Sequence, residues 1–308
     1  MRSTRTPKTE SGGQTALLPK KIAKVGVSPL KCQGIKTRLV QFIADNIAWQ
    51  GRGRWIEPFL GSAVVLFNLA PHRATVSDTN VHIIRFFRDI QCGALHEERV
   101  RTYLIDADRE LRKHGQRYFN EIRERFNRDG GSLDFLFLNR SCYNGMMRFN
   151  RAGGFNVPFG HKPNRFRQAY VTKILNQIAW VRELIRGKDW IFRVADWKGT
   201  VAEARSDDFV YMDPPYIGRH TGYFNSWTLD EAEQLAESAR ELPCGFALSM
   251  WKENRYRKNS HLEEQWSGLC TRTHSHFYHV GPSEDLRNAM LEALIVKPGY
   301  AVRRRGYR

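Results

Sequence analysis

The chain has 308 residues, of which 41% are hydrophobic, so it can bury a sizeable core and wholesale disorder is excluded. Its 49 Lys and Arg against 32 Asp and Glu give a formal net charge of +17, which predicts a polyanionic partner such as nucleic acid or an anionic membrane surface. Five dispersed cysteines without CxxC spacing argue against a disulfide framework and a zinc site, and suit a reducing cytosol.

The basic excess is segregated along the chain. Residues 1–27 carry six bases and one acid, residues 99–193 carry 20 bases and nine acids, and residues 297–308 carry five bases and no acid. A well-solvated basic surface without a specific partner is the simpler alternative, but solubility alone does not explain segregated charge. The uncharged run at 59–71 is too short to span a membrane, and no apolar segment follows the basic N-terminus, so we expect neither a membrane helix nor a secretory signal.

Residues 1–27 are polar and basic, which predicts a mostly disordered arm. The pattern that follows predicts a helix at 34–50, a strand at 54–57, a turn at 58–61, a helix at 62–70, a strand at 74–77 that ends in Asp78, and a helix at 80–91. This order of strand, turn, helix, strand and acid is the first half of an open α/β nucleotide-binding sheet.

A helical, basic stretch interrupts that alternation. Its predicted elements are helices at 97–127, 132–142 and 168–186 and a Gly/Asn-rich hairpin at 145–160. Strands then resume at 190–195, which ends in Asp196, and at 209–212, followed by a helix at 229–241 and strands at 245–250, near 271–278 and 290–297. We therefore predict a Rossmann-like α/β domain from 28–96 and 187–300, an insertion at 97–186 and a basic tail at 301–308.

The strongest motif is Asp213-Pro214-Pro215-Tyr216, directly after the hydrophobic strand 209–212. Two consecutive prolines lock φ and remove two N–H donors, so the Pro214 carbonyl is held in a fixed direction beside the Asp213 carboxylate. Two acceptors that take both hydrogens of an exocyclic amine favour a pyramidal nitrogen with an exposed lone pair. Tyr216 adds an aromatic face on which an extruded base can stack.

With other motifs in the same order, this constellation resembles the Dam-type (class α, D12 family) DNA adenine-N6 methyltransferases that use S-adenosylmethionine. The resemblance covers about residues 28–300, and its anchors are Pro29-Leu30-Lys31 with Gly34 and Lys36, Glu57-Pro58-Phe59-Leu60-Gly61-Ser62, Asp78-Thr79-Asn80, Leu138-Asn139-Arg140, Tyr143-Asn144-Gly145, Arg148-Phe149-Asn150, Gly154-Phe155-Asn156-Val157-Pro158-Phe159-Gly160 and Asp213–Tyr216. It implies an α/β fold with a Rossmann-like methyltransferase sheet and an inserted helical DNA-recognition domain that contains a β-hairpin. It also implies a site-specific adenine methyltransferase.

The resemblance implies a site for each substrate. S-adenosylmethionine is expected to meet Lys36, Phe59, Gly61, Asp78, Asp196 and Asp213, and the catalytic residues are expected to be Asp213, Pro214, Pro215 and Tyr216. Double-stranded DNA is expected to meet Lys31, Arg140, Tyr143, Asn144, Arg148 and Asn150. Arg148 is the candidate for a bidentate guanine contact, because only a fork donor meets O6 and N7 together.

Simpler explanations stand beside some of these assignments. Turn chemistry alone accounts for Asn144, Asn150, Gly153 and Gly154. The segment 219–227, with Tyr223, Phe224 and Trp227, resembles the loop that closes over the flipped base, but an aromatic cluster packed on the sheet has the same composition. The histidines at 274, 276 and 279 alternate as in a strand, so no metal site is expected.

This chain departs from the family pattern at Cys32, where an aromatic residue is usual, and at Ile35 and Ala63, where glycine is common. These departures are expected to weaken or reshape cofactor binding. A decayed enzyme that only binds DNA would also tolerate them, although the intact Asp-Pro-Pro-Tyr motif argues against such decay.

The expected reaction is direct methyl transfer from S-adenosylmethionine to N6 of a flipped adenine. The alternatives are the same transfer to cytosine N4, to an RNA adenine or to a glutamine side chain, and a non-catalytic nucleic-acid-binding module. Asp ahead of Pro-Pro-Tyr favours adenine. The expected setting is the cytoplasm of a bacterial cell or a phage-infected host, and both a restriction endonuclease partner and the oligomeric state stay open.

Overall fold

The computed structural model describes residues 18–19, 21–216, 227–255, 258–277 and 289–303. Most of the predicted basic arm, residues 219–226 of the predicted closing loop, His279 and the end of the predicted basic tail lie outside the described residues. Within these ranges, no helix has both the length and the apolar character to cross a bilayer.

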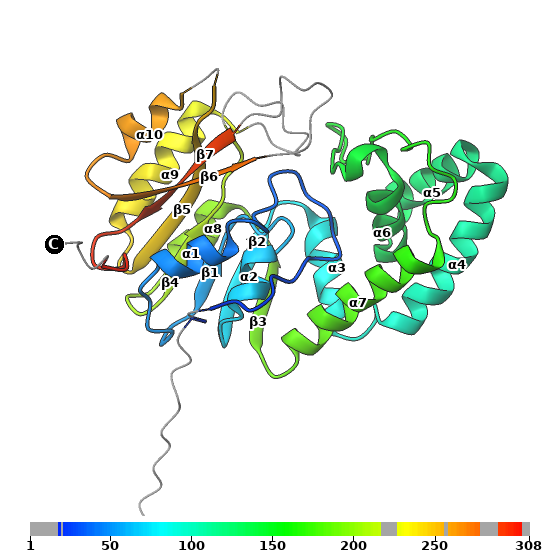
Figure 1. The fold of residues 1–308 in the computed structure, drawn as a ribbon, viewed down its shortest axis with the longest axis horizontal. Coiled ribbons are helices and arrows are strands. Elements are labelled where there is room, and N and C mark those ends of the chain that lie inside the picture. The colour runs from blue at the N-terminus through cyan, green and yellow to red at the C-terminus, as the bar shows by residue number, and fades with distance from the viewer. Residues whose placement is uncertain (1–17, 20, 217–226, 256–257, 278–288, 304–308) are drawn as a thin grey trace, which may run out of the picture.

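A seven-stranded sheet with the order β3-β2-β1-β4-β5-β7-β6 organises the chain (Figure 1). The strands are β1 (Trp55–Glu57), β2 (Arg73–Asp78), β3 (Asp189–Val194), β4 (Phe209–Met212), β5 (Gly245–Glu253), β6 (Cys270–Phe277) and β7 (Ala289–Val296). The first five are parallel to their neighbours, whereas β7 lies antiparallel between β5 and β6. This arrangement confirms the predicted α/β fold with a Rossmann-like sheet.

Helices cover both faces of the sheet, which explains why β4 is buried along its whole length. The helices are α1 (Val40–Asn46), α2 (Val64–Leu69), α3 (Val81–Gln91), α4 (Glu97–His114), α5 (Gln116–Asp129), α6 (Ser132–Ser141), α7 (Gln168–Ile185), α8 (Trp197–Ala202), α9 (Leu229–Glu241) and α10 (Ser260–Gln265). Because strand side chains alternate, Trp55 and Tyr211 join the core with α1, α2 and α3, while Ile56 and Met212 join a second core with α8, α9 and α10.

Some boundaries differ from the predictions. The helix expected at 34–50 is only α1, because Gly34 has a left-handed φ of 72° and Ile47 leaves the helix to bridge Ala301. The short helices α8 and α10 were not predicted. The expected hairpin at 145–160 is held by two isolated antiparallel bridges, Cys142 to Phe159 and Phe149 to Phe155, rather than by regular strands.

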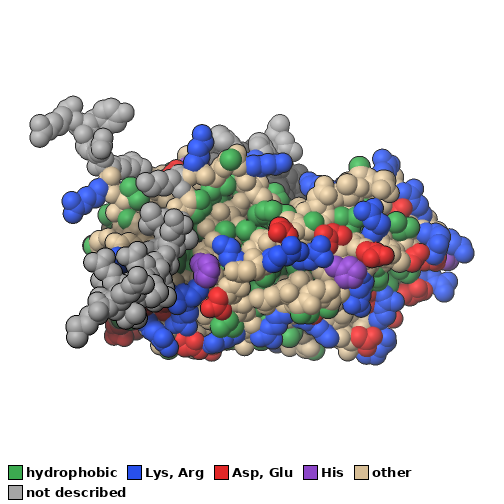
Figure 2. Space-filling model, turned by 90° about the horizontal axis from the view of Figure 1, so that it is seen from below, with side chains coloured by type: hydrophobic (Ala, Val, Ile, Leu, Met, Phe, Trp, Pro, Cys, Tyr) green, Lys and Arg blue, Asp and Glu red, His purple; other side chains and the backbone are tan. Residues whose placement is uncertain are grey.

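Helices α4, α5 and α6 gather at one end of the molecule, and α7 runs beside them and leads back to β3 (Figure 1). Gly115, with φ of 53°, separates α4 from α5. Phenylalanines hold this part together, among them the stacked pairs Phe126–Phe135 and Phe137–Phe166. On the face shown in Figure 2, Lys and Arg are interspersed with Asp and Glu rather than gathered into a single patch.

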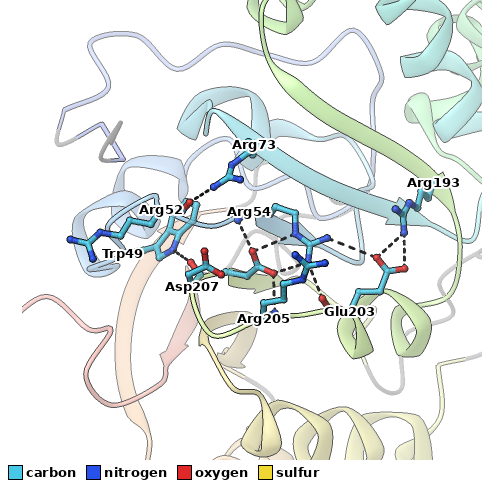
Figure 3. Close-up of polar contacts among 9 residues, drawn as sticks. Trp49, Arg52, Arg54, Arg73, Arg193, Glu203, Arg205 and Asp207 are labelled. Carbon is cyan, nitrogen blue, oxygen red and sulfur yellow. Dashed lines mark hydrogen bonds and ion pairs between the residues drawn. The ribbon is translucent and has the colours of Figure 1, made fainter. Parts of the chain in front are cut away.

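A buried ion pair anchors the edge of the sheet at which β1 and β4 begin. Asp208 is 2% exposed and accepts hydrogen bonds from the Arg54 guanidinium at 2.7 Å, from the Arg54 amide at 2.6 Å and from the Arg205 amide at 2.9 Å. Beside it, the Trp49 indole donates to the Asp207 carbonyl at 3.1 Å (Figure 3). Burial raises the pKa of Asp208, but the hydrogen bonds from Arg54 and the backbone outweigh burial and leave the pKa below its usual value.

We expect Asp208→Ala to lower the free energy of unfolding by about 3 kcal/mol, because it leaves the Arg54 guanidinium and two amides without their buried acceptor. The matched control is Asp207→Ala, whose side chain is exposed and which should change stability by less than about 0.5 kcal/mol. Urea denaturation followed by tryptophan fluorescence measures both variants. Equal losses for the two variants would contradict this role of Asp208.

Candidate active site

Three acids lie at one edge of the sheet. Glu57 ends β1, Asp78 ends β2, and Asp213 directly follows β4. Since β1 pairs with β2 on one side and with β4 on the other, all in parallel, the carboxyl ends of these strands meet at this edge. Open α/β sheets bind their ligands at that edge.

Asp213 is oriented by two partners from other parts of the chain. The Ser249 hydroxyl on β5 donates to Asp213 Oδ1 at 3.0 Å, and Lys36 Nζ lies 2.8 Å from the same oxygen. Ser249 also lies 2.8 Å from the Tyr211 hydroxyl, so β4 and β5 share this polar contact beneath the motif. The Asp213 side chain keeps 23% of its surface exposed, which leaves it accessible to a ligand.

Lys36 is nearly buried, at 3% exposure. Its ammonium donates to Tyr216 Oη at 2.9 Å and to the Gly34 carbonyl at 3.2 Å, besides its ion pair with Asp213. It also lies 5.0 Å from the centre of the Tyr216 ring. Lys36 therefore joins the first and the last residue of the Asp-Pro-Pro-Tyr motif.

The acids at this edge differ in protonation because their surroundings differ. Burial, with a smaller contribution from the charge of Asp213, raises the pKa of Glu57 to about 8. Burial also raises the pKa of Asp213 above its usual value; the ion pair and hydrogen bond with Lys36 offset only part of that rise, and the charge of Glu292 adds to it. Glu57 is thus mostly protonated at neutral pH, whereas Lys36 favours the ionised form of Asp213.

Asp78 shapes the turn that follows β1. Its two carboxylate oxygens accept from the Gly61 and Asn80 amides, each at 2.9 Å. Gly61 has a left-handed φ of 48°, and apart from its two chain neighbours no described residue has a heavy atom within 4 Å of the place that a Cβ would take. The Asp78 carboxylate therefore holds the backbone of this turn, while the side of Gly61 on which a Cβ would lie is open. Phe59 belongs to the same turn.

Two of the three departures from the family pattern, Ala63 and Cys32, lie at or near this turn. Ala63 has a φ of 58°, a left-handed conformation that costs a residue with a Cβ about 1 kcal/mol, which explains why glycine is common there. Burial raises the pKa of Cys32, and the charge of Asp78 raises it further, which places this half-buried thiol within electrostatic reach of Asp78. Ile35 packs against the core.

Asp196 follows β3 and caps α8, with its Oδ1 accepting from the Gly199 amide at 2.8 Å. It lies near Asp78, because Val194 pairs in register with Asp78 and the Ala195 amide donates to the Asp78 carbonyl. Its side chain is exposed. A contact with the adenine of a cofactor stays a prediction.

A hollow lies beside Pro214, Pro215 and Tyr216. Its other walls come from β5, α9, α10 and neighbouring residues, namely Trp227, Ala232, Leu235, Leu248, Met250, Trp251, Asn259, His261 and Trp266. The Trp227 ring packs edge-on against the Phe59 ring, with 5.5 Å between the ring centres, and its centre lies 6.4 Å from that of the Trp197 ring. Trp227 therefore packs in an aromatic cluster, which is the simpler explanation given above for the aromatic residues of the predicted closing loop.

Arg140 is not a surface residue, which corrects its assignment to DNA. It is 3% exposed, and its guanidinium donates to the Pro29 carbonyl at 2.8 Å and to Gln177 at 2.6 Å. The same guanidinium also donates to the Ser28 carbonyl and to the Tyr170 hydroxyl, each at 3.4 Å. Arg140 therefore ties the N-terminal segment to α6 and α7, and the sequence pattern had no feature that separates such a buried arginine from a phosphate contact.

The other DNA candidates lie on or near the segment that follows α6. Tyr143, Asn144, Arg148 and Asn150 are exposed, and Asn144 has a left-handed φ of 52°. The Arg148 guanidinium donates to the Asn156 side chain at 2.8 Å, and Asn150 Oδ1 accepts from the Gly154 amide at 2.8 Å. The proposed turn chemistry is therefore present at Asn144 and Asn150, and their contacts with DNA stay predictions.

Lys31 lies against this segment. Asn139 accepts from the Lys31 amide at 2.8 Å and donates to its carbonyl at 2.9 Å. Gly145 has a φ of 66°, which residues with a Cβ rarely adopt, and a Cβ there would stand 2.4 Å from Lys31 Cδ, so both the backbone and the close approach favour glycine. Burial lowers the pKa of Lys31, and the Tyr170 hydroxyl partly offsets that effect.

His82 of α3 packs against the same segment. Its ring stacks on the Phe149 ring, with 5.5 Å between the ring centres and 10° between the ring planes. The centre of the Phe126 ring lies 4.5 Å away. Burial lowers the pKa of His82 to about 4, so the ring is neutral at physiological pH and packs like an apolar aromatic. The helix after β2 therefore supports the exposed segment that carries Arg148.

Sequence reasoning missed Ser249, Tyr211 and Glu292 as members of the site. Glu292 is 1% exposed, and each of its oxygens accepts from the Tyr216 hydroxyl at 3.1 Å. A usable signal was present for Glu292, because it is the single charged residue in the apolar strand β7. Ser249 and Tyr211 carry no such signal, since a hydroxyl in a buried strand is common.

Comparison with known proteins finds a matching family and several similar proteins. The family described as D12 class N6 adenine-specific DNA methyltransferase matches residues 33–270. A DNA adenine methylase of Vibrio cholerae is 31% identical over 224 residues, which are 69% of this chain and 75% of the relative. The type II methyltransferase M.MjaIII of Methanocaldococcus jannaschii is 28% identical over 69% of this chain and 79% of its own length. The DNA adenine methylase of Escherichia coli K12 is 30% identical over 61% of this chain and 66% of its own length.

Glu57→Gln tests the protonation of this edge. Between about pH 4.5 and 8 the folded chain holds a proton on Glu57 that the unfolded chain has lost, so the free energy of unfolding falls as pH rises through that window. A glutamine stays neutral, so the variant should gain up to a few kcal/mol relative to wild type between pH 5 and 8. Urea denaturation at both pH values measures this gain, and Glu98→Gln, an exposed control, should show none.

Proposed function

This chain belongs to the D12 class of N6 adenine-specific DNA methyltransferases, and on that premise we propose that it transfers a methyl group from S-adenosylmethionine to N6 of an adenine turned out of the duplex. The protein is an adenine-specific DNA methyltransferase, and DNA is its substrate. The observation that carries the proposed mechanism is the Asp213 carboxylate, held at the open edge of the sheet next to the rigid Pro214 carbonyl.

The residues at this edge suit S-adenosylmethionine. The open space above Gly61 and the acids Asp78 and Asp213 offer room for a nucleoside and negative charge for a cationic donor. When bound, the donor supplies a methyl group that is already activated on a positively charged sulfur. We assign its site to Lys36, Phe59, Gly61, Asp78, Asp196 and Asp213.

Asp213 holds the target amine in this mechanism. Both of its oriented contacts, from Ser249 and Lys36, go to Oδ1, and within the described part of the chain no hydrogen bond reaches Oδ2. Oδ2 and the Pro214 carbonyl then take the two hydrogens of N6. Because N6 becomes positive as the methyl group arrives, the Asp213 carboxylate stabilises the transition state electrostatically. The Tyr216 ring gives the everted base a surface to stack on.

DNA recognition is assigned to residues 97–186 together with Lys31. The exposed residues Tyr143, Asn144, Arg148 and Asn150 follow α6, and helices α4 to α7 belong to the same strongly basic stretch of the chain. Arg148 is the candidate for reading a guanine, with Asn156 holding its guanidinium in the free protein. A restriction endonuclease partner stays a prediction, since the relatives include both type II methyltransferases and DNA adenine methylases.

Asp213→Ala tests the mechanism. With labelled S-adenosylmethionine and duplex DNA, wild type should label adenine, and the variant should lose about 10²–10³-fold in kcat because the acceptor of the developing charge is gone. DNA affinity should change less than about threefold, since Asp213 makes no phosphate contact in this proposal. Asp207→Ala, at the opposite edge of the sheet, serves as the control and should keep wild-type kcat.

The outcomes separate the rival functions. No label with either protein, but retained DNA binding, would indicate a non-catalytic module. Label on cytosine, or on RNA alone, would reassign the methyl acceptor.

Arg148→Ala tests base reading. The variant should lose discrimination at one base pair by about 1–3 kcal/mol, because one bidentate guanine contact disappears. Arg151→Ala is the matched control on the same exposed segment, and it should weaken binding equally for all sequences. Competition binding with single-substitution duplexes measures both variants. If Arg148→Ala also weakens all sequences equally, Arg148 contacts phosphate and not a base.

A further inference from the structure

Glu292 is a buried carboxylate on a strand that the proposed mechanism does not use. It lies in β7, opposite Trp251 of β5 and His274 of β6, so the sheet fixes its backbone on both sides. Its neighbours along the strand are apolar, and it is 1% exposed. A carboxylate in such surroundings costs several kcal/mol of stability unless it is hydrogen-bonded. The groups that bind Glu292 therefore indicate what it does.

One partner of Glu292 is the Tyr216 hydroxyl. Both Glu292 oxygens lie 3.1 Å from Tyr216 Oη, and Lys36 Nζ lies 2.9 Å from the same atom. A lysine ammonium has donors only, so the hydroxyl oxygen accepts from Lys36. The one hydrogen of the hydroxyl is therefore directed to Glu292, and the hydroxyl has a single orientation.

This contact holds the Tyr216 ring at its far end. The near end is held by the backbone, because Pro215 fixes its own φ immediately before Tyr216. The Tyr216 hydroxyl also accepts from Lys36, which is paired with Asp213 Oδ1. One hydrogen-bonded chain thus runs from Glu292 through Tyr216 and Lys36 to Asp213.

We infer that Glu292 is a positioning residue for methyl transfer: it holds the Tyr216 ring, and through its hydroxyl the Lys36 ammonium, in the arrangement that the target adenine and Asp213 require. The inference rests on the proposed function. We assign its effect on the reaction to the Tyr216 hydroxyl, from which both of its oxygens accept.

A double-mutant cycle with Glu292→Gln and Tyr216→Phe tests this route. Glu292→Gln keeps the shape but replaces a charged acceptor, and it should lower kcat about tenfold while KM for DNA changes less than about threefold. Tyr216→Phe should lower kcat by a similar factor. The double variant should be no slower than the slower single variant, because Glu292 has no hydroxyl left to hold. Glu264→Gln, the same change at an exposed position on α10, should leave kcat unchanged.

Glu292→Asp provides a second measurement if thermal unfolding shows that Glu292→Gln does not fold. It keeps the charge but draws the carboxylate back by one methylene, so it should lower kcat in the Tyr216 protein and have no effect in the Tyr216→Phe protein. Two results would overturn the inference but not the proposed function. One is a wild-type kcat in the Glu292 variants that keep Tyr216, and the other is that the effects of the two substitutions multiply in the double variants. A wild type that labels no adenine would overturn the proposed function, and the inference with it.

Discussion

The buried ion pair between Lys36 and Asp213 is the interaction on which the site depends. An ammonium at 3% exposure is tolerated only where acceptors surround it, and here they are Asp213, the Tyr216 hydroxyl and the Gly34 carbonyl. To deliver Lys36 to that place, the segment before α1 must lie across the open edge of the sheet. That requirement explains why the segment turns at Gly34 and why α1 begins only at Val40.

The same segment also meets the helical end of the chain. Arg140 holds the Pro29 carbonyl, Asn139 holds both backbone groups of Lys31, and Gly145 is packed on the Lys31 side chain. The residues that we assign to DNA therefore lie next to a stretch of backbone that continues, within a few residues, to Lys36. The helical end is joined to the catalytic edge by hydrogen bonds as well as by packing.

Three acids at one edge serve three different purposes because their neighbours differ. Asp78 uses both oxygens to hold backbone amides and so shapes the turn at Gly61. Glu57 is buried, and its pKa of about 8 keeps it mostly protonated at neutral pH. Asp213 has a cation beside one oxygen and solvent access for the rest of its side chain, which suits a group that must meet a developing positive charge.

The sequence by itself determined the α/β class, the strand that precedes Asp213, the acid that ends β2 and the family, because local periodicity and short motifs carry that information. It did not separate the buried Arg140 from the exposed Arg148, and it did not reveal that Ser249 and Glu292 join the site. Such assignments depend on which strands become neighbours, since β7 reaches Tyr216 only by inserting between β5 and β6. Contacts between residues far apart in the chain leave no periodic signal, and only tertiary packing decides them.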